Sequence, residues 1–409
     1  MLKAYKFRLR PTDEQKALLS QQAGSCRWLW NHFLELNQAE YKKTGKFIFA
    51  HQLIVSLPIL KKEYEWLGST FSQSLQQVAR HFDRALKDFL NPELKREFPV
   101  FKKKAKMRDS FTIPQKFRIE KSYVFIPKVG EIAWIKHRDI KGKVKNLTIK
   151  QDGNQWYCSV CVELKVKKTV VEIDPNRVVG IDMGLKTYAT MSDGSKVENP
   201  KTLAKYQKRL NRANRSLQKR KKGSKNRDKQ RLEVARLHRK IRNVRRDFQH
   251  KTTAAMITKY DGFVLEDLNI QGMLKNHCLA KAISDAGWYE YKRQLLYKAE
   301  WAGKPVIEIG RFEPSSKTCS CCGWYDKDLT LADREFVCQE CSNIQDRDLN
   351  AAINIRNIGM KTVGWDCIRT GELVSRTAED DKRFMPQGRC LSKNQQKECS
   401  GLNELVSLN

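Results

Sequence analysis

No stretch of the 409-residue sequence provides about 18 consecutive apolar residues, the length that a membrane-spanning helix requires. The first ten residues also lack the apolar core of a signal peptide, because Tyr5, Phe7 and Leu9 alternate with basic or small residues in the pattern of a β-strand. The sequence therefore excludes a transmembrane helix and predicts a cytoplasmic protein.

Acidic residues are scarce relative to basic ones. The chain holds 46 Asp and Glu against 79 Lys and Arg, which gives a formal net charge of +33 at pH 7. A surplus of this size requires polyanions nearby, and nucleic acid is the usual one; an anionic membrane surface and simple solubility are the alternatives. Hydrophobic residues make up 40% of the chain, enough for packed cores in about two to four domains.

The 12 cysteines do not form the pattern of a disulfide framework, which would be unusual in a chain this long and basic. Cys158 and Cys161 lie on a predicted strand, face opposite sides and are interpreted as packing residues. Two C-x2-C pairs, separated by 15 residues, are formed by Cys319, Cys322, Cys338 and Cys341. Because Zn²⁺ takes four thiolates tetrahedrally, this spacing predicts one structural zinc ribbon at 311–345, with Cys321 left over.

The order of patterns along the chain predicts its organisation. A first strand is followed by helical periodicity, then by a basic, extended connector at 98–104, and then by several strands, the last two joined by a turn at Asp152–Asn154. We expect the first strand to join the later ones in a small β-barrel, with the helical block inserted into it. The expected limits are 1–10 and 111–172 for the barrel, 11–110 for the helical domain, 176–310 and 346–364 for a mixed α/β domain, and 365–409 for a polar, disordered tail.

Residues 201–250 carry 20 Lys and Arg against three acidic residues. Two apolar stripes at heptad-like spacing lie beneath this charge, with Gly223 between them, and the second stripe runs Leu237, Ile241, Val244 and Phe248. The pattern predicts an antiparallel helical hairpin. Because the segment holds too few acids for internal pairing, we expect phosphate contact and not merely a solvated face. The expected contact residues are Lys208, Arg209, Arg212, Arg215, Lys219, Arg220, Arg239, Arg242, Arg245 and Arg246.

Acidic residues also occur at the ends of elements that are otherwise apolar. Asp182 and Glu266 each end an apolar strand pattern, where a buried charge is costly unless it is paired or bound to metal. Asp346 and Asp348 open a helical pattern, and Asp346 can cap it. Three converging carboxylates could hold two Mg²⁺ ions for in-line displacement at a phosphodiester. The alternative is three unrelated structural acids.

These motifs resemble the TnpB family of RNA-guided endonucleases encoded by insertion sequences. The resemblance is carried by Gly180–Gly184, Leu265–Leu268, the two cysteine pairs and Asp346–Ala352, and it covers residues 1 to about 360. It implies a multidomain α+β and α/β fold. A wedge-type β-barrel carries an inserted helical recognition domain, and a RuvC (ribonuclease-H-like) nuclease domain is interrupted by the zinc ribbon.

The resemblance also implies the chemistry and the partners. Asp182, Glu266 and Asp348 would be the catalytic magnesium ligands, the second acid of the Asp-x-Asp-x-Asn motif carrying the role. The partners would be a guide RNA from the transposon end and target double-stranded DNA flagged by a short motif, on the nucleoid of a prokaryote. A DNA transposase with the same carboxylates and an RNA-guided DNA-binding repressor are the rivals. The oligomeric state stays open, with a monomer favoured.

Overall fold

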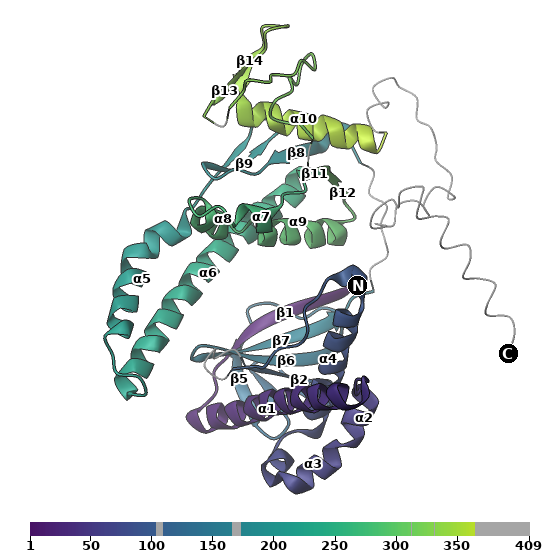
Figure 1. The fold of residues 1–409 in the computed structure, drawn as a ribbon, viewed down its shortest axis with the longest axis vertical. Coiled ribbons are helices and arrows are strands. Elements are labelled where there is room, and N and C mark those ends of the chain that lie inside the picture. The colour runs from purple at the N-terminus through teal and green to yellow at the C-terminus, as the bar shows by residue number, and fades with distance from the viewer. Residues whose placement is uncertain (104–108, 166–172, 312, 331, 365–409) are drawn as a thin grey trace, which may run out of the picture.

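The computed structural model describes the whole chain except residues 104–108, 166–172, 312, 331 and 365–409, so the tail predicted at 365–409 lies outside the described residues. Figure 1 shows the N-terminal half below, the C-terminal half above, and a long helical hairpin reaching down beside them. No helix in the described part of the chain is long and apolar enough to cross a membrane.

The N-terminal half is built on a seven-stranded sheet whose paired strands are antiparallel. The first strand, residues 2–9, lies within this sheet. It pairs along its whole length with the strand that comes last in the sequence of this sheet, and its end also pairs with a second strand. Tyr5, Phe7 and Leu9 are buried, as their alternation predicted. Cys158 is buried and Cys161 is half-buried, in agreement with opposite faces. The order across the sheet is β2 (Ser110–Ile113), β6 (Lys143–Asp152), β7 (Gln155–Glu163), β1 (Leu2–Leu9), β5 (Gly130–Ile135), β4 (Tyr123–Ile126) and β3 (Arg118–Ile119).

A helical block inserted after β1 packs on this sheet. Its first helix begins at the cap Thr12, whose side chain accepts from Gln15 N while the Gln15 side chain accepts from Thr12 N, and it ends at Gly45 in the left-handed region. The apolar face of the last long helix lies on the first helix and on β2. The block and the sheet therefore share one hydrophobic core. The helices are α1 (Asp13–Thr44), α2 (Ala50–Val55), α3 (Leu57–Glu63) and α4 (Ser72–Leu90).

The C-terminal half is built on a five-stranded mixed sheet. The strands β8, β11 and β12 are parallel to one another, whereas β9 pairs antiparallel with β8 and β10 pairs antiparallel with β9. The order is β10 (Lys196–Glu198), β9 (Thr187–Met191), β8 (Val178–Asp182), β11 (Gly262–Glu266) and β12 (Val306–Ile309).

Helices cover both faces of this second sheet (Figure 1). On one face, Val179 and Leu265 belong to a core shared with α6 (Lys225–Lys259), α8 (Ala280–Ala286) and α9 (Trp288–Ala302). On the other face, Val178 and Val264 pack against α10 (Arg347–Thr362). Because side chains alternate along a strand, this arrangement determines toward which face of the sheet the side chain of each later residue of β8 and β11 points.

The basic segment forms the predicted helical hairpin, from α5 (Thr202–Gln218) and α6 (Lys225–Lys259). Leu210, Leu237 and Ile241 are buried in its seam. The prediction was wrong at Val244, which is 39% exposed. The heptad stripe ends at Ile241 because α6 continues beyond its contact with α5, and the apolar side chain after Val244, Phe248, packs against the core of the second sheet.

Candidate active site, cysteine cluster and basic hairpin

Two of the three candidate acids end neighbouring parallel strands. Asp182 is the last residue of β8 and Glu266 the last of β11, and the register pairs Ile181 with Leu265 immediately before them. Alternation places both acids on the face that Val178 and Val264 turn toward α10. The strands thus bring together two residues that lie far apart in the sequence.

The third acid comes from the helix that packs on that face. Asp348 lies in the first turn of α10, and the close approach of α10 to the sheet requires Gly180, where a Cβ would collide with the α10 backbone at Ala352 and Arg356. Figure 1 shows α10 lying across β8 and β11. The sheet and the helix therefore direct Asp182, Glu266 and Asp348 toward one site.

Asp346, two residues earlier, has a different environment. Its Oδ1 accepts from the backbone of Asp348 at 2.9 Å and of Leu349 at 3.1 Å, so it is the helix cap that the sequence predicted. Its Oδ2 is 2.7 Å from Lys196 Nζ. Both carboxylate oxygens of Asp346 thus have partners. For Asp348, one carboxylate oxygen, Oδ1, lies 3.7 Å from Nη2 of Arg347.

The pKa of Asp182 reflects both its burial and the charges of the other two acids. Burial most of all, and then the charges of Glu266 and Asp348, raise the pKa of Asp182 to about 7, although Arg347 opposes them. Burial also raises the pKa of Glu266, which a hydrogen bond from Ser315 partly offsets. The three carboxylates offer only hard oxygen donors, and burial makes Asp182 and Glu266 resist ionisation, so the group fits a divalent cation such as Mg²⁺.

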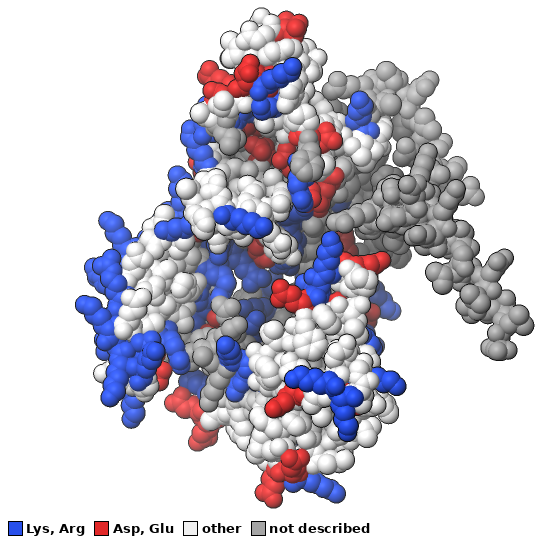
Figure 2. Space-filling view, in the orientation of Figure 1, with Lys and Arg blue, Asp and Glu red and all other residues white. Residues whose placement is uncertain are grey.

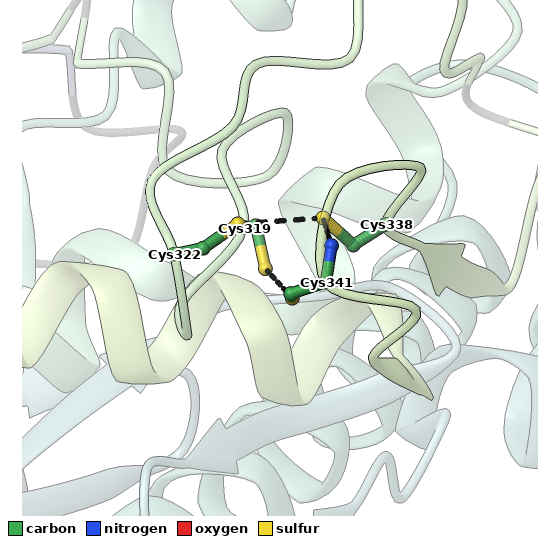
Figure 3. A group of neighbouring side chains, drawn as sticks. All are labelled: Cys319, Cys322, Cys338 and Cys341. Atoms are coloured by element: carbon green, nitrogen blue, oxygen red, sulfur yellow. Dashed lines mark hydrogen bonds between the residues drawn. The ribbon is translucent and has the colours of Figure 1, made fainter.

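The two cysteine pairs converge as the spacing predicted. The Sγ atoms of Cys319 and Cys341 are 3.7 Å apart and those of Cys322 and Cys338 are 3.5 Å apart (Figure 3). All four lie within 4.8 Å of one another and could hold a metal ion. Cys321 is exposed and stands outside this group. Among the residues that the structure describes, no set of three or more carboxylates converges as tightly as these thiols.

The ribbon that carries the cysteines is hydrogen-bonded to α10. It includes the hairpin β13 (Glu335–Val337) and β14 (Ile344–Asp346), and it packs on two buried amides of the helix, Asn350 and Asn354. Their Nδ2 atoms donate to Thr318 O at 2.8 and 2.6 Å, and Asn350 Oδ1 accepts from Ser320 N at 2.9 Å. The helix that presents Asp348 therefore also holds the first cysteine knuckle.

Sequence reasoning missed several residues around the acids. Ser315 bonds to Glu266, Arg347 lies beside Asp348, and Asn354 has no role that a motif would suggest. Only Asn350 carried a signal, as the last residue of the Asp-x-Asp-x-Asn motif. The other contacts depend on long-range packing, which local patterns do not encode.

The ten basic residues expected to contact phosphate fall into two groups. In the first group, Arg239 Nη1 donates to Asp152 O at 2.8 Å and Arg242 pairs with the Asp152 carboxylate, which docks α6 on the β6–β7 turn. Further partners are acids or carbonyls: Glu233 for Arg209, Ser284 and Asp285 for Arg245, and Glu290 for Arg246. Most of these partners lie outside residues 201–250, so the scarcity of acids within the segment did not reveal them.

The second group lies toward the far end of the hairpin. Its members are exposed, and four of them line a shallow groove together with Ser216, Lys221, Ser224 and Asn226. Figure 2 shows Lys and Arg gathered over this end of the hairpin, at the left of the view. The group consists of Lys208, Arg212, Arg215, Lys219 and Arg220.

Comparison with known proteins identifies the family. The chain is 34% identical over 393 residues to a protein of Escherichia coli K12 named "Putative RNA-guided DNA endonuclease InsQ", covering 91% of this chain and 95% of that protein. The chain belongs to the IS605 OrfB (TnpB) family. A Streptomyces pristinaespiralis member named "Putative RNA-guided DNA endonuclease" is also 34% identical, over 94% of this chain and 96% of its own length.

Family models match three parts of this TnpB-family chain. The IS605 OrfB model, described as a probable transposase, matches 159–277, and the Cas12f1-like TNB domain matches 288–355, which includes the cysteine cluster. A helix-turn-helix model matches 1–46, although in the structure this segment is β1 followed by one uninterrupted helix, α1.

A solved structure shows the same fold at low sequence identity. The protein in a cryo-EM structure of a Cas12f1–sgRNA–target DNA complex aligns over 87% of this chain and 99% of its own, with a TM-score of 0.54 and 15% identity. The multidomain fold of helices and sheets expected of the TnpB family is confirmed by this likeness.

Proposed function

We propose that this TnpB-family chain is an RNA-guided DNA endonuclease of an insertion sequence, which cleaves target DNA beside a short motif by metal-dependent phosphodiester hydrolysis. The observation that carries the proposal is the convergence of acids from β8, β11 and α10 on one face of the nuclease sheet. The names of the relatives from Escherichia coli and Streptomyces support guidance by RNA and a DNA substrate.

In this proposal Asp182, Glu266 and Asp348 hold Mg²⁺, which we expect as two ions. Mg²⁺ bound there would stabilise charge on the attacking and leaving oxygens of the scissile phosphodiester. The chain's own part is to hold the carboxylates in place, since they lie at strand ends and in the first turn of α10. Asp346 caps the helix and is not a ligand.

The remaining parts of the chain serve binding and support. The four thiols Cys319, Cys322, Cys338 and Cys341 would hold one structural Zn²⁺, because a site with four protein ligands leaves no position for substrate. The exposed cations of the hairpin would contact the phosphates of the guide RNA or its duplex with target DNA. For residues 1–364 we propose the same domain limits as the sequence suggested. From the bacterial relatives, we also propose that the protein acts on the chromosome in the cytoplasm.

The test is programmed cleavage by the whole chain. The protein is purified with the RNA that accompanies it, that RNA is sequenced, and its guide segment is replaced to direct cutting of a chosen duplex in Mg²⁺. Cleavage that follows the guide and stops in Asp182→Ala supports the proposal. Cutting and joining of strands without RNA would instead identify a transposase, and guided binding without cutting would identify a repressor.

A further inference from the structure

A buried serine of the ribbon touches one of the proposed catalytic acids. Ser315 lies just before the first cysteine pair and is 6% exposed, and its Oγ donates a hydrogen bond to Oε1 of Glu266. We infer that Ser315 is a positioning residue, which fixes the Glu266 carboxylate and leaves Oε2 available to a cation shared with Asp182 and Asp348. This inference rests on the function proposed above.

The same helix that presents Asp348 holds Ser315 in place. Asn354 of α10 is 7% exposed, and its Nδ2 donates to Ser315 O at 2.8 Å and to Thr318 O at 2.6 Å. The backbone carbonyls of the serine itself and of a residue three positions later are therefore tied to α10. One rigid helix presents one acid directly and, through Asn354 and Ser315, fixes an oxygen of a second acid.

Glu266 needs such a partner more than Asp182 and Asp348 do. A glutamate has one more rotatable bond than an aspartate, and its terminal torsion is broad and weakly restricted. Without a bond to one oxygen, the Glu266 carboxylate would sample several orientations, only some of which point at the other acids. Removing a hydrogen-bond partner of a metal-binding group commonly lowers metal affinity or activity by about 10–100-fold.

The chain offers a matched pair of variants for the test. Ser315→Thr keeps the hydroxyl and Ser315→Val replaces it by a methyl of the same shape, so both impose the same steric change. In the RNA-bound full chain, we expect Ser315→Val to cut about 10–100-fold more slowly than Ser315→Thr and to need more Mg²⁺ for half-maximal cleavage. Mn²⁺ binding, followed by electron paramagnetic resonance without any cleavage, should weaken in parallel. Zinc content should be equal in both, and Ser316→Ala is the neighbouring control.

Two results would overturn the inference. The first is that the Thr and Val variants cut at equal rates and need equal amounts of metal, since only the hydroxyl distinguishes them. Equal loss of cleavage because both variants misfold would count as the same result. The second is an additional loss of Mn²⁺ affinity when Ser315→Val is added to Glu266→Ala, because a residue acting through Glu266 has no further effect once that side chain is gone. If either result is found while Asp182→Ala is inactive, only the role of Ser315 is refuted and the proposed endonuclease function stands. An active Asp182→Ala would refute the proposed function itself.

Discussion

At the scale of single residues, acids that lie close together in the sequence differ in the partners that their carboxylates contact. Asp346 and Asp348 are two positions apart, yet the first uses both oxygens to cap α10 and to pair with Lys196, and the charge of the second acts on Asp182. A carboxylate that is already engaged is a poor cation ligand. The distinction gives the catalytic assignment an internal control.

Replacing any one of Asp182, Glu266 and Asp348 by Ala should nearly abolish cleavage in Mg²⁺, while guide RNA and target DNA stay bound. The losses should be non-additive in double variants, because the acids act as a unit. Asp346→Ala should lower stability by about 0.5–2 kcal/mol, the usual cost of losing a helix cap, and keep substantial activity. Single-turnover cleavage and thermal melting provide the measurements. An inactive Asp346→Ala beside an active Asp348→Ala would reverse the assignment.

The raised pKa of Asp182 makes a separate prediction about stability without Mg²⁺. Its pKa in the folded chain is about 7, above the ordinary value of 3.8, so folding favours its protonated form. Stability is therefore lost as the pH rises from about 4 through about 7 and the buried acid ionises. Asp182→Asn should raise the melting temperature of the Mg²⁺-free protein more at about pH 8 than at about pH 5. An equal effect at both pH values would contradict this.

At the scale of elements, the ribbon and the hairpin have different relations to the nuclease sheet. The ribbon is fixed to α10 by Asn350 and Asn354, so it is part of the support of the site. The hairpin is fixed near its middle by Arg239 and Arg242 on the β6–β7 turn, and its far end extends outward with exposed cations. The ribbon is therefore held against α10, whereas the far end of the hairpin presents its cations to the outside.

One Zn²⁺ per chain should be found by elemental analysis of the pure protein. Cys338→Ser should lose it, because a tetrahedral site with three thiolates binds zinc more weakly. Cys321→Ser should retain it, since that side chain is exposed outside the cluster. Zinc-free wild-type protein, or full retention after Cys338→Ser, would refute the site.

Neutralising Arg212, Arg215, Lys219 and Arg220 to Gln should weaken RNA binding and flatten its dependence on salt. Removing one cation that binds a phosphate should lower the log–log slope by about 0.7–0.9. The matched control is Arg239→Gln with Arg242→Gln, which removes two cations that already have protein partners; it should lower the melting temperature more than the salt slope. Binding titrations at several salt concentrations decide between them, and equal slopes for wild type and the four-residue variant would show a merely solvated face.

At the scale of the whole molecule, the two halves meet through charged contacts and carry a large common surplus of charge. The formal +33 is self-repulsive in a free chain, and a bound polyanion relieves this repulsion. We expect RNA to co-purify with the chain, and its removal by ribonuclease should lower the melting temperature, an effect that diminishes at high salt. A melting temperature that does not respond to RNA would mean that the halves hold their arrangement unaided.

The sequence by itself determined the features that depend on local chemistry: the alternation in β1, the apolar runs of β8 and β11 that end in an acid, the cap at Asp346, the hairpin and the cysteine spacing. These follow from strand and helix periods and from the reach of a two-residue spacer. Only the tertiary structure decided which cations of the hairpin are engaged by Asp152 and its neighbours, why the apolar stripe stops before Val244, and that Ser315 touches Glu266. Such contacts join residues far apart in the chain, and their partners are chosen by the packing of whole elements, which no local pattern contains.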